Sequence, residues 1–137
     1  MAYFNQERKA KMAPSIKAIC KKYDIKASLA VRHHSTVCLN IKQGAIDFIS
    51  NANKVAEARA HGGEWRKVEK SLDVNPYWYQ EHFDGKALKF LKEVFAVLRG
   101  PGFFDHSDIQ TDYFNCSHYI DVNIGQWDKP YTLTIAN

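Results

Sequence analysis

Long apolar stretches are absent from this chain, and so are the features of an exported protein. No segment approaches the roughly 18 apolar residues that a membrane-spanning helix needs. The first residues, MAYFNQERKAKM, carry charges where a signal peptide has its apolar core. We therefore expect a protein that is neither secreted nor membrane-spanning.

Cysteine is scarce, with three residues in a chain of 137. Cys20, Cys38 and Cys116 are far apart, form no Cys-x-x-Cys pair and leave an odd residue under any disulfide scheme. Such usage is typical of proteins in a reducing compartment. We expect a cytoplasmic protein.

Motifs of the common nucleotide-dependent and hydrolytic enzymes are also missing. The chain has no GxxxxGK[ST] loop, no GxGxxG turn and no GxSxG elbow. These absences weigh against the enzyme classes that use those motifs. We expect no cofactor.

Charge is distributed unevenly along the chain. Residues 1–26 carry seven Lys and Arg against two acidic residues, a net charge of +5, whereas residues 100–137 carry five Asp against one Lys, a net charge of −4. Such asymmetry indicates either a surface that recognises a charged partner or two ends that neutralise each other in the fold. The pI of about 8.9 permits nucleic-acid binding but is too mild to argue for it alone.

Composition predicts a single domain over residues 1–137. With 45% hydrophobic and 13% aromatic residues, the chain can bury a core without metal or disulfide support. Apolar residues recur at helical spacing over residues 5–23, and Pro14 predicts a kink or a fresh start in this amphipathic helix. A second helix is expected after its cap at Asp84 and before the break at Gly100-Pro101-Gly102.

Alternation of apolar and polar residues predicts the strands. Residues 27–31 and 37–41 indicate a hairpin with one buried face, and residues 118–124 indicate a half-buried strand. A helix over residues 50–60 is expected behind a capping Ser50 and before a stop at His61-Gly62-Gly63, whereas residues 45–49 either extend the sheet or begin a helix. Residues 132–135 predict a short edge strand. Together these elements predict an α+β fold, a two-layer domain in which helices pack on one face of a small, mainly antiparallel sheet.

Potential metal ligands are concentrated near the C-terminus. Their spacing matches no known metal motif, and Asp residues after a Gly-Pro-Gly break commonly cap turns through the backbone. Turn formation is therefore favoured, and no metal ligand is assigned. The residues of these ligand types are Asp105, His106, Asp108, Asp112, Cys116 and His118.

Cys116 and His118 lie two residues apart and share one face of the expected strand, which makes a nucleophilic pair conceivable. No orienting partner or oxyanion site can be read from the sequence. Alternation places His118 on the apolar face, so a buried core histidine is favoured over a catalytic base. We assign no catalytic residue.

Lysines and aromatic residues form the candidate interaction set. The lysines of the N-terminal helix fall mainly on its polar side, which is most often only a solvated surface. Combined with the other residues of the set, they form either a basic stacking surface for single-stranded nucleic acid or the anchors of a protein interface. The sequence does not separate these two alternatives. The candidate partner-binding residues are Lys9, Lys17, Lys21, Arg32, His33, Trp65, Tyr77 and Trp78.

Three segments carry a family resemblance: SLAVRHHSTVCLNIKQGAIDF, YWYQEHFDGKALKFLKEV and TDYFNCSHYIDVNIGQWDKPY. They resemble small proteins and modules of phages and plasmids that are grouped as large polyvalent protein-associated domains. The third segment is the most specific, and residues from about 50 to about 75 look like a variable insertion. The matching positions are Asp112, Tyr113, Tyr119, Asp121, Asn123, Trp127 and Pro130.

The resemblance implies a mobile-element accessory protein that acts against the defences of a bacterial host. We expect a non-enzymatic protein in the host cytoplasm that binds and sterically inhibits a defence protein or ribonucleoprotein complex, such as a CRISPR effector. One alternative is a nucleic-acid-binding accessory protein of the same origin. Another is a metal-dependent enzyme that uses the Asp, His and Cys residues near the C-terminus.

Overall fold

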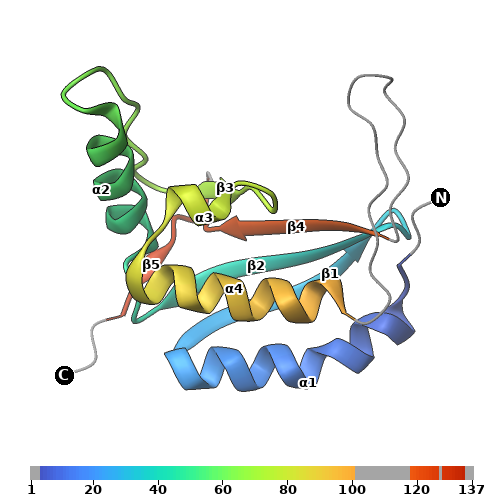
Figure 1. Ribbon diagram of the computed structural model, residues 1–137. Coiled ribbons are helices and arrows are strands. Elements are labelled where there is room, and N and C mark those ends of the chain that lie inside the picture. The colour runs from blue at the N-terminus through green and yellow to red at the C-terminus, as the bar shows by residue number, and fades with distance from the viewer. Residues whose placement is uncertain (1–3, 101–117, 127, 135–137) are drawn as a thin grey trace, which may run out of the picture.

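The computed structural model describes residues 4–100, 118–126 and 128–134 (Figure 1). Within these ranges the chain forms four helices and five strands in an interleaved order. In chain order they are α1 (Gln6–Tyr23), β1 (Ile25–Arg32), β2 (Thr36–Gly44), α2 (Phe48–Ala60), β3 (Leu72–Val74), α3 (Tyr79–His82), α4 (Gly85–Arg99), β4 (Tyr119–Ile124) and β5 (Thr132–Leu133).

The five strands form one mixed sheet in the order β1-β2-β4-β3, with β5 paired to the end of β2. β1 and β2 form the expected antiparallel hairpin, and β3 is antiparallel to β4. The α+β class is confirmed, but the sheet is less antiparallel than predicted because both β4 and β5 run parallel to β2. A parallel pair needs a long crossover, and here the chain between β2 and β4 includes α4.

Helices α1 and α4 lie side by side and cover one face of the sheet, whereas α2 stands at one end of it (Figure 1). The apolar positions of β2 and β4 point into this layer, as the alternation predicted. A single core forms between the helices and the sheet. Its fully buried members include Val37, Leu39, Val122, Phe90 and Phe95.

α1 does not restart at Pro14, because the helix is continuous from Gln6 to Tyr23. An interior proline costs about 3 kcal/mol through a lost hydrogen bond and a steric clash. Three buried side chains that follow it, Ile16, Cys20 and Tyr23, anchor the helix to the core and offset this cost.

α2 begins at Phe48, within the segment that was expected either to extend the sheet or to begin a helix, and its cap is Asp47 rather than Ser50. The carboxylate of Asp47 accepts hydrogen bonds from the backbone N–H of Ser50 at 3.0 Å and from the Ser50 hydroxyl at 2.7 Å. Phe48, the first helical residue, is fully buried in the core. The predicted stop is correct, since His61 adopts a left-handed conformation directly after Ala60.

Residues 50–75, expected as a variable insertion, are built into the domain. They contain most of α2 and also β3, whose residues Leu72–Val74 pair with β4. The sheet therefore depends on this segment, whereas its variability stays a prediction.

Gly125 ends β4 at a point where the chain passes very close to itself. Its φ of +71° is in the left-handed region, and a Cβ there would lie 2.5 Å from the Tyr131 nitrogen and 2.9 Å from the Lys70 carbonyl oxygen. The Gly125 N–H donates to the carbonyl of Ile41 at 2.8 Å, so the turn is tied to β2. This close approach explains why glycine follows the strand.

We predict that Gly125→Ala destabilises the protein by about 2 kcal/mol or more, since backbone strain alone costs about 1–3 kcal/mol and a clash is added. Urea unfolding measures the change. Gly62→Ala is the matched control, because its φ is also positive but nothing lies within 4 Å of the added methyl group. Equal losses for the two variants would show that the clash at Gly125 is not real.

Candidate functional site

Exposed aromatic side chains gather at the junction of β3, α3 and β4. Tyr77 is 67% exposed, Trp78 57% and Tyr119 43%, and they are three of the five large hydrophobic residues exposed in the described part of the chain. Tyr77 and Tyr119 line the same hollow, and Trp78 follows Tyr77 in the chain. We call Tyr77, Trp78 and Tyr119 the aromatic surface.

The turn that presents Tyr77 and Trp78 is held by hydrogen bonds. The side-chain oxygen of Asn75 accepts from the backbone N–H of Tyr77 at 2.8 Å and of Trp78 at 3.1 Å. The Pro76 carbonyl accepts from the Arg99 guanidinium at 3.2 Å. Both exposed rings therefore project from backbone that is fixed to α4.

A hollow of about 170 Å³ is lined by the Tyr77 and Tyr119 side chains. Its walls come from the Pro76 turn, from Arg99 at the end of α4 and from residues 118–120 at the start of β4. The volume suits one inserted side chain and is below the range of sites for whole small molecules.

His118 lies beneath this hollow and is a core histidine, as predicted. The residue is 1% exposed, and its Nε2 donates to the Leu98 carbonyl at 2.7 Å. Burial holds the pKa of His118 below its usual value, the Leu98 hydrogen bond opposes this shift, and the Arg8 guanidinium adds to it. The ring therefore supports packing and is neutral near pH 7.

Four lysines surround a second hollow, of about 450 Å³, beside the free edge of the sheet. Lys17 and Lys21 come from α1, Lys26 from β1 and Lys42 from β2. All four side chains are exposed. The remaining lining is apolar and comprises Ile16, Cys20, Ile25 and Ala27. We call this hollow the lysine groove.

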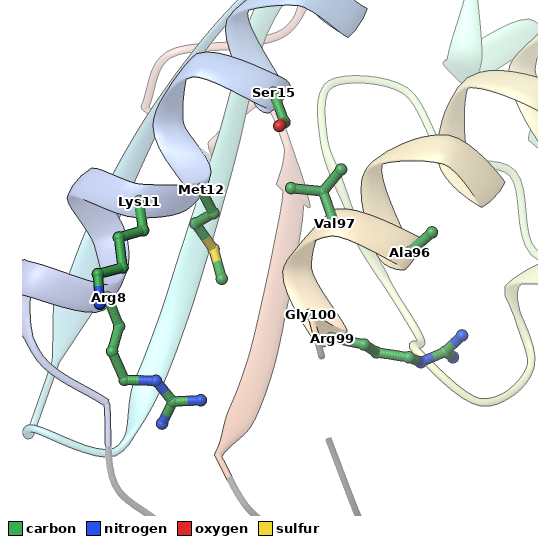
Figure 2. A pocket seen from close by; sticks show the side chains of 8 residues that line it. All are labelled: Arg8, Lys11, Met12, Ser15, Ala96, Val97, Arg99 and Gly100. Carbon is green, nitrogen blue, oxygen red and sulfur yellow. The ribbon is translucent and has the colours of Figure 1, made fainter. Parts of the chain in front are cut away.

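A third hollow, of about 510 Å³, lies between the first half of α1 and the end of α4. Figure 2 shows Met12 and Val97 projecting from the two helices into the space between them, with Arg8 below them and the Arg99 guanidinium directed away from Arg8. The cations here are already engaged: Arg8 lies over the Phe4 ring at 5.1 Å, and Lys11 is 3.8 Å from Glu7. Arg99 contacts the Pro76 carbonyl.

The sheet face opposite the helices carries a polar network. Asp121 accepts from Arg32 at 3.2 Å and from the Asn123 amide at 3.2 Å. The Cys38 sulfur lies 3.6 Å from an oxygen of Asp121 and 3.6 Å from the side-chain oxygen of Asn40, and its single thiol hydrogen can be donated to either. Burial and the neighbouring Asp121 raise the pKa of the Cys38 thiol, so this cysteine is a poor nucleophile. Asp121 and Asn123, positions of the family resemblance, therefore have a structural role.

The predicted partner-binding residues do not form one surface. Lys17 and Lys21 lie in the lysine groove, and Lys9 lies further toward the start of α1. His33 is in the β1–β2 turn, and Trp65, 38% exposed, is in the segment after α2. These two segments lie at opposite ends of the molecule (Figure 1).

The structure adds Lys26 and Lys42, which sequence reasoning missed and which complete the lysine groove. It also places Tyr119, predicted only as a position of the family resemblance, with Tyr77 beside the small hollow. The signal for Tyr119 was its position on the polar face of an alternating strand. No local pattern connects Lys26 and Lys42 with α1, because their proximity depends on strand pairing.

Several predicted positions lie outside the described residues, namely Asp105, His106, Asp108, Asp112, Tyr113, Cys116 and Trp127. Pro130 follows the turn at Asp128-Lys129 and lies beside the end of β2, where it helps to line a shallow hollow. Within the described ranges, no group of three His, Cys, Asp or Glu side chains is placed to hold a metal ion. No described helix has the length and apolar character to cross a membrane.

Comparison of the chain with family models, curated proteins and solved structures finds no match. The resemblance to the large polyvalent protein-associated domains therefore stays a prediction, and the residues themselves must support any function.

We predict that acidification destabilises the protein through His118. Because its pKa is lower in the folded than in the unfolded chain, the unfolded state takes up the proton first. Stability is intact above about pH 6.5 and falls as the pH drops from there toward the folded pKa. The urea midpoint, measured from about pH 7.5 to about pH 5.5, should fall, and His118→Gln should flatten the dependence.

His82→Gln is the control for this experiment, because His82 is exposed in α3. In this variant the urea midpoint should fall with decreasing pH as steeply as in the wild type. An unchanged slope in His118→Gln would contradict the assignment of the effect to the buried ring.

Proposed function

We propose that the protein is a binding domain that docks onto a partner protein through the aromatic surface of Tyr77, Trp78 and Tyr119. The observation that carries this proposal is that two exposed rings, Tyr77 and Tyr119, line one small hollow, and a third exposed ring, Trp78, follows Tyr77 in the chain. Tyr, Trp and Arg dominate the energetics of protein interfaces, and Arg99 lines the same hollow.

Preorganisation supports the proposal. The Asn75 side chain and the Arg99 guanidinium fix the turn before any partner arrives. Tyr79, which follows Trp78 in the chain, stacks on Phe95 with ring centroids 4.4 Å apart and anchors the turn in the core. A rigid turn loses little conformational entropy on docking, so more of the interaction energy appears as affinity.

The expected partner is a host defence component, and the expected mechanism is steric. A small domain with a fixed aromatic anchor covers part of a functional surface and excludes the natural substrate. Inhibition of a defence complex stays a prediction that rests on the resemblance. No observation among the described residues favours the metal-dependent enzyme, so it is not proposed.

The test uses bacteria whose CRISPR effector targets an incoming plasmid. The tagged protein should restore transformation and should copurify with the effector in stoichiometric amounts. Tyr77→Ala/Trp78→Ala should lose both effects, because interface anchors of this kind contribute about 2 kcal/mol or more each, roughly thirtyfold in Kd. Titration calorimetry with the purified effector measures the affinity.

Trp65→Ala is the matched control, since Trp65 is an exposed tryptophan outside the aromatic surface. It should bind as the wild type does. If the wild-type protein neither restores transformation nor retains the effector, the defence-inhibitor hypothesis is wrong. Equal losses in the Trp65 variant would show that the aromatic surface is not the contact site.

A further inference from the structure

We propose that the lysine groove binds the phosphodiester backbone of a nucleic acid. The site lies apart from the aromatic surface and rests on a separate observation. Four ammonium groups from α1, β1 and β2 surround one hollow, and the other lining residues are apolar. No carboxylate belongs to the lining.

The charges of the lysine groove are not neutralised by the described part of the protein. None of the four lysines takes part in any of the ion pairs found there. Lys22, on another side of the same helix, instead forms an ion pair with Glu93 at 3.0 Å. Asp24, in the turn between α1 and β1, is the nearest acid in sequence and does not line the groove.

The type of cation favours a phosphate chain over a single bound anion. Lysine is a flexible point charge, whereas specific recognition of one carboxylate or phosphate typically uses the planar fork of arginine. The groove also lacks a buried polar side chain that would orient a small ligand, since its polar residues are exposed lysines. Dispersed, mobile ammonium groups suit the repeated charges of a nucleic-acid backbone.

The edge of β1 argues against a peptide that adds to the sheet. Lys26 pairs with Gln43 and Ala27 with Ile41, so the extra residue at this point is Lys42 of β2, and its side chain enters the groove lining. An exposed lysine on an edge strand, here Lys26 on β1, is one of the features that discourage strand addition in natural sheets.

The absence of aromatic residues from the lining defines the mode of binding. The lysine groove contains no ring on which a base could stack, and the aromatic surface follows β3 and begins β4, away from the β1 edge. The expected combination of lysines and aromatics for single strands is therefore not assembled at this site. The contacts are to phosphates alone, and duplex DNA or RNA is preferred because its charge density is higher.

The experiment measures anisotropy of a short labelled duplex with the full chain, from about 50 to about 200 mM salt. Four phosphate contacts predict a slope of log Kobs against log salt of about −3.6, and Lys17→Gln/Lys42→Gln should reduce its magnitude to about 1.8. Duplexes of unrelated sequence should bind equally, and a single strand of the same length should bind more weakly.

Lys54→Gln/Lys86→Gln is the matched control, because it removes two exposed lysines from α2 and α4 and changes the net charge equally. The control should keep the slope of the wild type. Equal loss in both double variants would overturn the site in favour of general attraction to a basic protein. Absence of salt-dependent binding would overturn it outright.

Two further results separate the proposal from its competitors. A polyglutamate peptide that binds with the affinity and slope of the duplex would overturn nucleic acid as the ligand. Tyr77→Ala/Trp78→Ala should bind the duplex with the affinity and salt dependence of the wild type. Failure of the protein-docking proposal and failure of this one are therefore distinguishable. Tighter binding of single strands that is lost in that variant would overturn the backbone-only mode.

Discussion

The pairing of β2 on both sides is the constraint on which the rest of the structure depends. β2 is hydrogen-bonded to β1 on one side and to β4 and β5 on the other, and its side chains Val37, Leu39 and Ile41 are buried beneath the helices. Each such side chain contributes about 1.5–3 kcal/mol of hydrophobic stabilisation. Because the strand is central, β1 and β3 are left as opposite edges, and the lysine groove and the aromatic surface are separated.

The face of the sheet opposite the helices carries polar interactions within the protein. On the face opposite the helices, Arg32 and Asp121 pair with each other, and Cys38 lies buried among Asp121, Asn40 and Asn123. A solvent-accessible ion pair of this kind contributes at most about 1 kcal/mol to the stability of the fold, so its main effect is that each charge neutralises the other. At the β1 edge the four groove lysines form none of the ion pairs found among the described residues, and exposed aromatic rings lie beside the β3 edge.

Local sequence patterns predicted most elements, and their errors have physical causes. Alternation correctly placed His118, Val122 and Ile124 on the buried face of β4, because the two-residue period is a property of the strand itself. The predicted cap of α2 was wrong, since burial of Phe48 and capping by Asp47 outweighed the local preference for Ser50 as a cap. The parallel β2–β4 pairing had no local signal, because strand direction follows from the crossover between the strands.

The sequence by itself determined three of the four described helices, most of the strands and the opposed charges of the two ends. These properties follow from side-chain periodicity and composition, which act over a few residues. Only the tertiary structure decided which charged and aromatic residues meet. Lys17 and Lys21 lie beside Lys26 and Lys42 because α1 packs against the β1–β2 pair, and Tyr77 reaches Tyr119 because β3 pairs with β4. Contacts between residues far apart in the chain depend on the packing of the whole core, which no local pattern encodes.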